Sequence, residues 1–127
     1  MAAHIEGPLY YERLGRRGPP MLFVHPNPMD HSCWLFQMAH FSSWFRCIAV
    51  DVPGYGRSPK ADAGLTLADM AQACWEALDA AMAASASTSA HESGMALKEK
   101  VANSPIDSPA ILVGCSVGSS IIEQMFH

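Results

Sequence analysis

The 127-residue sequence has no cluster of basic residues and no long apolar run. Its eight Lys and Arg residues are outnumbered by twelve Asp and Glu residues, and the formal net charge at pH 7 is -4. Only Arg16 and Arg17 adjoin each other, so the basic patch that attracts nucleic acid is missing. No apolar stretch approaches the roughly 20 residues of a membrane-spanning helix. We therefore expect no nucleic acid and no membrane among the partners.

The cysteines and histidines form no recognisable metal or redox motif. No two cysteines show C-x-x-C spacing, and no histidine has a second ligand at the spacing of a helical or finger-type metal site. We expect no metal, no cofactor and four reduced thiols that pack as small apolar groups. The first fifteen residues also lack the basic and apolar segments of a secretory leader. These features predict a cytoplasmic protein without disulfides.

Short apolar segments predict the strands of a parallel sheet. Half of the residues are hydrophobic, which is enough for the core of one domain. Residues 20–25, 46–52 and 110–115 are continuous apolar runs, the pattern of strands buried on both faces. Residues 9–14 are mixed in polarity, which predicts an outer strand. Because helix-sized gaps separate the three core strands, the sequence favours an α/β fold built from βαβ units.

The first gap carries a helical pattern. Met38 and Phe41, together with Trp34 or Leu35, stand at three- and four-residue spacing within residues 30–43. This spacing predicts a helix with one apolar face.

The second gap contains a longer helical pattern followed by a segment of different character. Thr66 precedes Asp69 by three residues, the spacing of a capping box. Residues 83–105 are rich in small and polar side chains and show no periodicity, so we expect a flexible surface insertion there. Between the capping box and residues 83–105, apolar residues recur at helical spacing and form one stripe: Leu67, Met70, Ala71, Cys74, Trp75, Leu78 and Met82.

Residues 114–118 read G-C-S-V-G and follow a predicted strand. A helix-forming segment comes next, and this strand-turn-helix setting is the one that a nucleophile elbow requires. The tight turn would hold Ser116 in a strained backbone conformation, with Gly114 and Gly118 leaving room for the neighbouring strand and helix. The glycine patterns of dinucleotide and phosphate loops are absent. The alternative is a small-residue turn with an inert serine.

Four features in this order resemble the α/β-hydrolase family. Residues 25–28 (HPNP) are similar to its H-G-x-P oxyanion loop, and residues 51–58 (DVPGYGRS) to its D-x-P-G-x-G-x-S turn. The amphipathic helix and the elbow complete the set. The resemblance implies that residues 1–127 are a partial domain. It would be the N-terminal half of an α/β-hydrolase sheet, mostly parallel with flanking helices and truncated after the nucleophile elbow.

The resemblance also implies roles for single residues. Ser116 matches the catalytic nucleophile, and the backbone N–H groups of Val117 and Asn27 match the oxyanion-hole donors. Pro26 departs from the pattern, because the family usually has glycine at this position and proline has no N–H.

Other matched residues are implied to be structural or to lie near the substrate. His25 and Asp51 match positions that hold their loops in place rather than take part in catalysis. Met29, Trp34 and Cys115 are expected on the floor of the substrate pocket, with simple packing as the alternative role for each.

The elbow residue narrows the chemistry that the resemblance implies. Family members that open epoxides or displace halide have aspartate at this position, whereas serine favours an acyl-enzyme formed from an ester-like or other acyl substrate. The family supplies Asp or Glu and then His after the serine. Only Glu123 and His127 follow here, and a helix would carry His127 about 16 Å along its axis, beyond hydrogen-bond reach.

Two hypotheses follow for the function. The chain is the N-terminal half of a serine hydrolase about twice as long, inactive by itself, with a small-molecule acyl substrate as its partner. Alternatively, it is an inactive truncated fragment that acts as a binding or regulatory module and self-associates through an open sheet edge.

Overall fold

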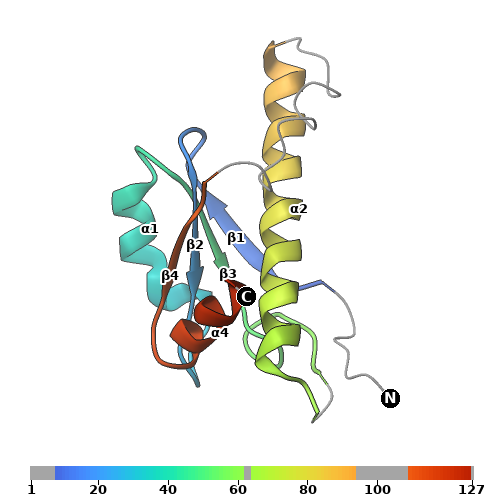
Figure 1. The fold of residues 1–127 in the computed structure, drawn as a ribbon. Helices are drawn as coiled ribbons and strands as arrows, with labels where there is room; N and C mark the ends of the chain where they lie inside the picture. Colours follow the sequence, from blue (N-terminus) through green and yellow to red (C-terminus); the bar gives the residue numbers. More distant parts are fainter. Residues whose placement is uncertain (1–7, 62–63, 94–108, 127) are drawn as a thin grey trace.

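The computed structural model describes residues 8–61, 64–93 and 109–126. In this part of the chain, strands and helical segments alternate along most of the sequence (Figure 1). In chain order they are β1 (Tyr11–Leu14), β2 (Pro20–Val24), the 3-10 helix η1 (His31–Trp34), α1 (Leu35–Phe41), β3 (Arg46–Val50), α2 (Leu67–Ser93), β4 (Ile111–Gly114) and α4 (Val117–Met125).

The strands form one mixed sheet in the order β1-β3-β2-β4. The strand β2 pairs in parallel with both β3 and β4, whereas β1 pairs antiparallel with β3 at the outer edge. The mostly parallel α/β fold is thus confirmed, and β1 forms the outer strand over Tyr11–Leu14 of the predicted residues 9–14. Val24 is aligned with both Val50 and Gly114. The carboxyl ends of the three parallel strands therefore lie side by side at one end of the sheet. The loops that leave these strands are neighbours.

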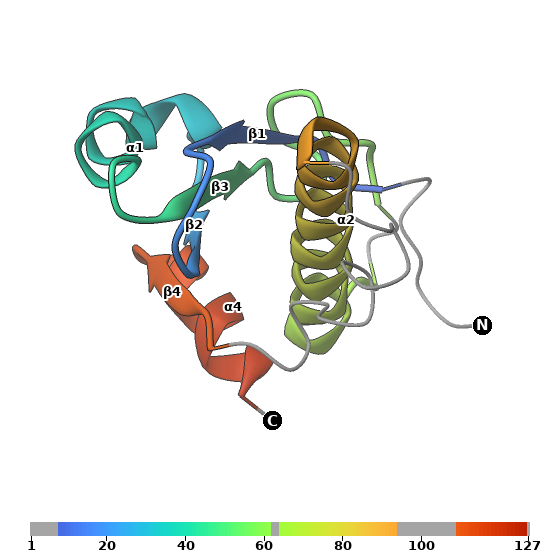
Figure 2. The same cartoon turned by 90° about the horizontal axis from the view of Figure 1, so that it is seen from above.

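Helices cover both faces of the sheet. The helix α1 lies on one face, and α2 and α4 lie on the other (Figures 1 and 2). Side chains alternate across the pleat of β2, so Leu22 and Val24 belong to the core under α2 and α4, while Met21 and Phe23 belong to the core under α1. Trp75 of α2 donates its ring N–H to the carbonyl of Met125 at 3.1 Å, which joins the two helices on the larger core.

The strand β4 is less buried than the sequence suggested. β2 and β3 are almost entirely buried, as expected of central parallel strands, but Ile111 of β4 is 40% exposed. In the described part of the chain β4 pairs only with β2. The prediction of burial on both faces was wrong for this strand because it lies at the edge of the described sheet.

The two predicted helices are present with shifted limits. In the first, Trp34 and Phe41 pack toward the core and Met38 is buried, whereas Leu35 is 53% exposed, so the apolar face uses Trp34. In the second, the Thr66 N–H bonds to the Asp69 carboxylate and the Asp69 N–H to the Thr66 hydroxyl. The predicted capping box is therefore present.

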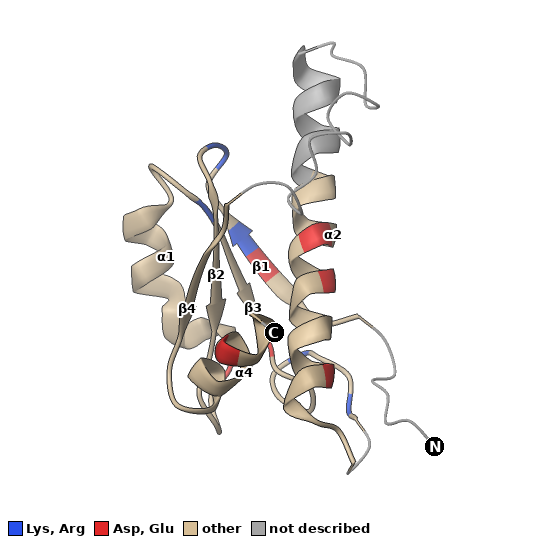
Figure 3. Cartoon of the chain, viewed as in Figure 1, with Lys and Arg blue, Asp and Glu red and all other residues tan. Residues whose placement is uncertain are grey.

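The helix α2 continues beyond its apolar stripe to Ser93. The predicted insertion at 83–105 is thus corrected over its first part, because residues 83–93 are helical. Among these residues, the alanines favour helix even without an apolar face, whereas the serines do not. Residues 94–105 lie outside the described part. Figure 3 shows acidic residues on the part of α2 that is not drawn in grey. No described helix is long and apolar enough to span a membrane.

Candidate functional site

The connection between β4 and α4 is a sharp turn at Ser116. The strand ends at Gly114, the helix begins at Val117, and Ser116 has φ 55° and ψ -121°. Among the described residues it is the only non-glycine residue with a positive φ. Such a conformation costs of order 1–3 kcal/mol and persists where the surroundings enforce it. The Ser116 side chain is exposed and makes no capping hydrogen bond with α4.

Two glycines allow this turn by leaving no side chain where backbones meet. A β-carbon on Gly118 would lie 2.2 Å from the carbonyl oxygen of Val24, inside van der Waals contact. A β-carbon on Gly114 would lie 2.7 Å from the carbonyl carbon of Gly118 and from the side chain of Ile122. The first turn of α4 therefore packs directly on the carboxyl end of β2, and Ser116 is held beside the loop that leaves that strand.

Two backbone N–H groups without a partner follow β2 and β4, one at the start of α4 and one in the loop after β2. Val117 is the first residue of α4, so its N–H has no partner within the helix, and the positive end of the helix dipole lies at the same place. Asn27 is exposed in the loop after β2, and its N–H makes no hydrogen bond within the described part of the chain. Both N–H groups are the predicted donors for an oxyanion.

The loop after β2 is fixed by His25, which is fully buried. Its Nε2 accepts the Val52 N–H at 2.9 Å, so Nδ1 carries the hydrogen and donates to the Pro26 carbonyl at 2.8 Å. The same carbonyl accepts the Met29 N–H at 3.0 Å. The loop thus holds its shape although Pro26 replaces the usual glycine, and both ring nitrogens of His25 are engaged away from Ser116.

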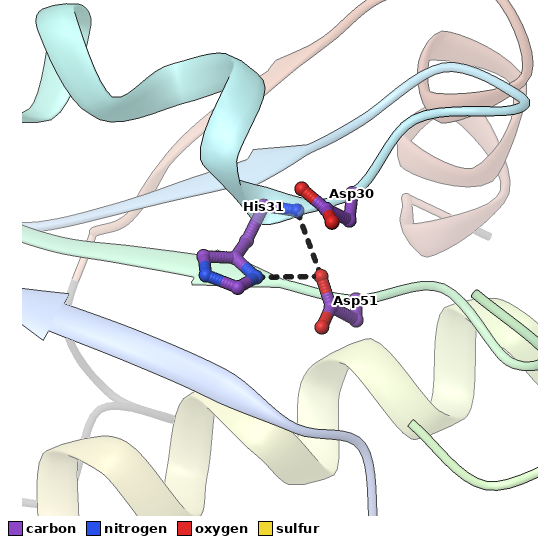
Figure 4. A group of neighbouring side chains, drawn as sticks. All are labelled: Asp30, His31 and Asp51. Carbon is purple, nitrogen blue, oxygen red and sulfur yellow. Dashed lines mark hydrogen bonds and ion pairs between the residues drawn. The ribbon is translucent and has the colours of Figure 1, made fainter. Parts of the chain in front are cut away.

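Asp51, at the end of β3, connects three segments through hydrogen bonds. Its Oδ1 accepts the backbone N–H and the ring Nδ1–H of His31, at 2.7 and 2.8 Å (Figure 4). Its Oδ2 accepts the Arg57 N–H at 2.9 Å, and a β-carbon on Gly56 would lie 2.2 Å from that oxygen. Ser58 donates its hydroxyl to the Asp51 carbonyl. The fully buried carboxylate therefore holds its own turn and the loop after β2 together.

One group of described side chains has metal-ligand types close together. Ligand atoms of Asp30, His31 and Asp51 lie within 4.8 Å of one another. The Asp30 carboxylate accepts hydrogen bonds from the hydroxyl and the backbone N–H of Ser32, which lower its pKa. The Asp51 carboxylate is occupied by three N–H donors. A metal ion would have to displace these donors and the His31 proton, so we assign the group to hydrogen bonding.

The three residues expected at the pocket floor lie in different surroundings. Met29 is 49% exposed in the loop after β2, and Cys115 is exposed directly before Ser116. Trp34 is half-buried and packs on Phe23, with ring centroids 5.3 Å apart. Its buried ring N–H has no partner in the described part of the chain. Trp34 therefore has a packing role. Met29 and Cys115 have accessible surface at the carboxyl end of the sheet, where Ser116 lies.

Sequence reasoning did not single out His31 as the partner of Asp51. The two residues are 20 positions apart and approach because each follows the carboxyl end of a neighbouring parallel strand. The sequence indicates this pair only by its position, because each of the two polar residues follows one of two predicted strands that are neighbours in the sheet.

Comparison with known proteins shows the family to which the chain is similar. Residues 21–126 match the model of the "Alpha/beta hydrolase family". A haloalkane dehalogenase of Mesorhizobium japonicum is 38% identical over 58 residues, which are 46% of this chain and 19% of that protein. The acetyltransferase component of the acetoin cleaving system of Pseudomonas putida is 29% identical over 118 residues, 91% of this chain and 32% of that protein.

Among solved structures, one described as "Est816 as an N-Acyl homoserine lactone degrading enzyme" is 26% identical with a TM-score of 0.64. The match covers 96% of this chain and 39% of that one. The chain thus spans less than two fifths of the length of each of these relatives. The family model covers residues 21–126, which is most of the chain, so the chain belongs to the alpha/beta hydrolase family.

Proposed function

We propose that this chain carries the nucleophile and the oxyanion hole of a serine hydrolase that acts on an ester-like or other acyl substrate. The observation that supports this most directly is the conformation of Ser116, exposed at φ 55° between β4 and α4. Glycine adopts a positive φ without strain, so a strained serine at the start of a helix gives no structural advantage over glycine. The strain is consistent with selection for the hydroxyl itself.

The residue at the elbow favours acyl chemistry over the reactions of some relatives. Matching proteins include a haloalkane dehalogenase and an epoxide hydrolase of Caenorhabditis elegans. In the family, members with those activities use an aspartate at the elbow to form an alkyl-enzyme ester. Serine at this position instead forms an acyl-enzyme as the bond from the acyl carbon to the alcohol or other leaving group breaks and that group departs with a proton. Water then hydrolyses the acyl-enzyme and releases the acid.

In the proposed reaction, Ser116 Oγ attacks the acyl carbon as its proton passes to a base. Negative charge then develops on the acyl oxygen. The N–H groups of Val117 and Asn27 would donate to this oxygen, and the N-terminal end of α4 adds its positive potential. Since neither donor has a partner in the described structure, no existing hydrogen bond is broken when the oxyanion forms.

The proposal takes the base and the acid from outside these 127 residues. His25 and His31 are engaged with Val52, Pro26 and Asp51. In the family the acid and the histidine follow the serine in chain order, and the chain covers only part of the length of its relatives. We therefore expect this chain alone to be inactive or nearly so.

A fluorophosphonate probe tests the nucleophile because it phosphonylates activated serine hydroxyls. The complete gene product should be labelled, and Ser116→Ala should abolish labelling. Ser120→Ala is the matched control, because Ser120 is an exposed serine one turn into the same helix and should leave labelling intact. Equal labelling of both variants would show that Ser116 is not the nucleophile.

The exposed edge of β4 favours a second candidate, a binding module that pairs through that edge. Strand edges with unpaired N–H and C=O groups recruit further strands. Size-exclusion chromatography and intact mass of the native product separate the candidates. A 13.7 kDa species that forms dimers and carries no probe label would favour the module. A markedly heavier, labelled product would favour the hydrolase.

A further inference from the structure

The helix α1 and the turn after it expose large apolar side chains outside the core. Phe36 is 88% exposed and Trp44 is 59% exposed, and Leu35 at the start of the helix is exposed as well. Phe36 and His40 are four residues apart, so they share one side of the helix. The His40 ring lies 5.7 Å from the Trp44 ring, which continues this side into the turn. We call Leu35, Phe36, His40 and Trp44 together the α1 surface.

The turn between β1 and β2 adds positive charge at the Trp44 end of the α1 surface. A β-carbon on Gly18 would lie 1.8 Å from the Trp44 carbonyl oxygen, so the two turns are in backbone contact. The Arg46 Nε–H donates to the Gly18 carbonyl at 2.8 Å and fastens the turn there. Arg16 and Arg17, directly before this glycine, are both exposed. The fold therefore brings two exposed arginines next to Trp44.

Negative charge is concentrated elsewhere in the molecule. The only acidic residue within 13–50 is Asp30, whose carboxylate accepts bonds from Ser32. Glu12 of β1 accepts a hydrogen bond from the Tyr10 hydroxyl. In Figure 3 the turn between β1 and β2 is blue and α1 carries no charged residue, whereas red marks α2 and α4 on the other face of the sheet. The same range, 13–50, contains four arginines: Arg13, Arg16, Arg17 and Arg46.

Exposed apolar side chains beside arginines match the chemistry of an anionic lipid bilayer. Aromatic rings bind at the boundary between headgroups and acyl chains, and arginines beside them are attracted to the negative headgroups. Leu35 is aliphatic, so it gains from hydrocarbon but offers no ring on which a nucleic-acid base could stack. The acidic helices lie on the far face of the sheet, where salt screens their repulsion from the bilayer.

We propose that this protein binds the surface of anionic phospholipid membranes through the α1 surface and the adjoining arginines. Phe36 and Trp44 would enter the boundary of the acyl chains, while Arg16 and Arg17 would lie among the headgroups. The sequence predicts no membrane partner because its arginines are dispersed and the aromatic residues are distant from them along the chain. The contact is peripheral, and it is independent of the proposed chemistry of Ser116.

Sedimentation with lipid vesicles tests the proposal on the complete gene product. The protein should bind vesicles made of equal parts of phosphatidylcholine and phosphatidylserine but not vesicles of phosphatidylcholine alone. Binding should weaken as salt is added. Trp44→Ser should weaken binding by about tenfold, because the apolar contact is lost. Arg16→Gln should weaken it by about fivefold, the usual effect of one basic residue near such a surface.

Two matched controls change the same kinds of side chain on the other side of the molecule. Leu67→Ser alters an exposed apolar residue at the start of α2, and Lys60→Gln removes an exposed positive charge from the loop that leads to α2. Both controls should bind the mixed vesicles as the unmodified protein does. Urea midpoints of all four variants show which of them fold normally. Equal losses in folded variants and folded controls would overturn the proposal.

Tryptophan emission identifies the side chain that enters the bilayer. Trp44 is the exposed one of the three tryptophans, so its emission should shift to the blue when mixed vesicles are added. Trp44→Phe should still bind but lose this shift, because phenylalanine keeps the apolar contact. Binding without a shift in the unmodified protein would overturn the assigned surface. A lipid-free dimer that Trp44→Ser dissociates, without any vesicle binding, would show that a second copy covers the α1 surface and would also overturn the proposal.

Discussion

His31 donates both its backbone N–H and its ring Nδ1–H to a single oxygen of Asp51, at 2.7 and 2.8 Å. The carboxylate is fully buried, and its second oxygen accepts the Arg57 N–H. The loop that carries Asn27 and the turn after β3 are thereby fixed to each other. The position of the proposed oxyanion donor thus depends on a residue that takes no part in the chemistry.

The first prediction concerns the Asp51 carboxylate. In Asp51→Asn the side-chain amide N–H₂ must face an N–H donor of His31 or Arg57, so at least one partly buried donor loses its partner. We expect the free energy of unfolding to fall by about 2–3 kcal/mol in urea denaturation. The control is Asp30→Asn, because asparagine also accepts a capping bond from Ser32 and should change stability by less than about 0.5 kcal/mol. Equal losses in both variants would contradict the role assigned to Asp51.

The second prediction compares two glycines with different surroundings. In Gly118→Ala the new β-carbon would lie 2.2 Å from the Val24 carbonyl oxygen, so α4 must move away from β2. We expect a loss of about 3 kcal/mol in stability and loss of fluorophosphonate labelling. In Gly54→Ala the β-carbon meets nothing within 4 Å, and only the φ of +85° is unfavourable. This variant should lose about 1–2 kcal/mol and keep its labelling. Unimpaired labelling of Gly118→Ala would mean that the elbow tolerates displacement of α4.

The elbow could be predicted from sequence because all its determinants are local. An apolar strand, G-C-S-V-G and a helix-forming segment are contiguous, and the close contacts of Gly114 and Gly118 are what that pattern requires. The pairing of His31 with Asp51 could not be predicted, because it depends on which strands are neighbours. The length of α2 was missed for another reason: residues 83–93 are helical although their small and polar side chains leave no apolar period to detect.

The third prediction separates the strain at Ser116 from its chemistry. Ser116→Gly removes the β-carbon that makes a φ of 55° unfavourable, so we expect the free energy of unfolding to rise by about 1 kcal/mol. Ser116→Ala keeps the strain and loses a hydroxyl that makes no capping bond, so its stability should change by less than about 0.5 kcal/mol. Both variants should lose the fluorophosphonate label. The urea midpoints of the three proteins are the measurement, and a destabilised Ser116→Gly would show that the turn is not strained.

The last prediction concerns pH and Cys74, which lies 1% exposed in the core under α2 and α4. Burial raises the pKa of its thiol from 9.0 to about 12, so the folded state holds this proton more tightly than the unfolded state. The resulting stability is fully present below pH 9 and is lost as pH rises toward about 12. Urea unfolding at pH 7 to 11 should therefore show a steeper alkaline loss in the unmodified protein than in Cys74→Ala. Other alkaline-titrating groups are common to both proteins and cancel in the comparison. Parallel curves for the two proteins would show that the Cys74 thiol does not resist ionisation in the folded state.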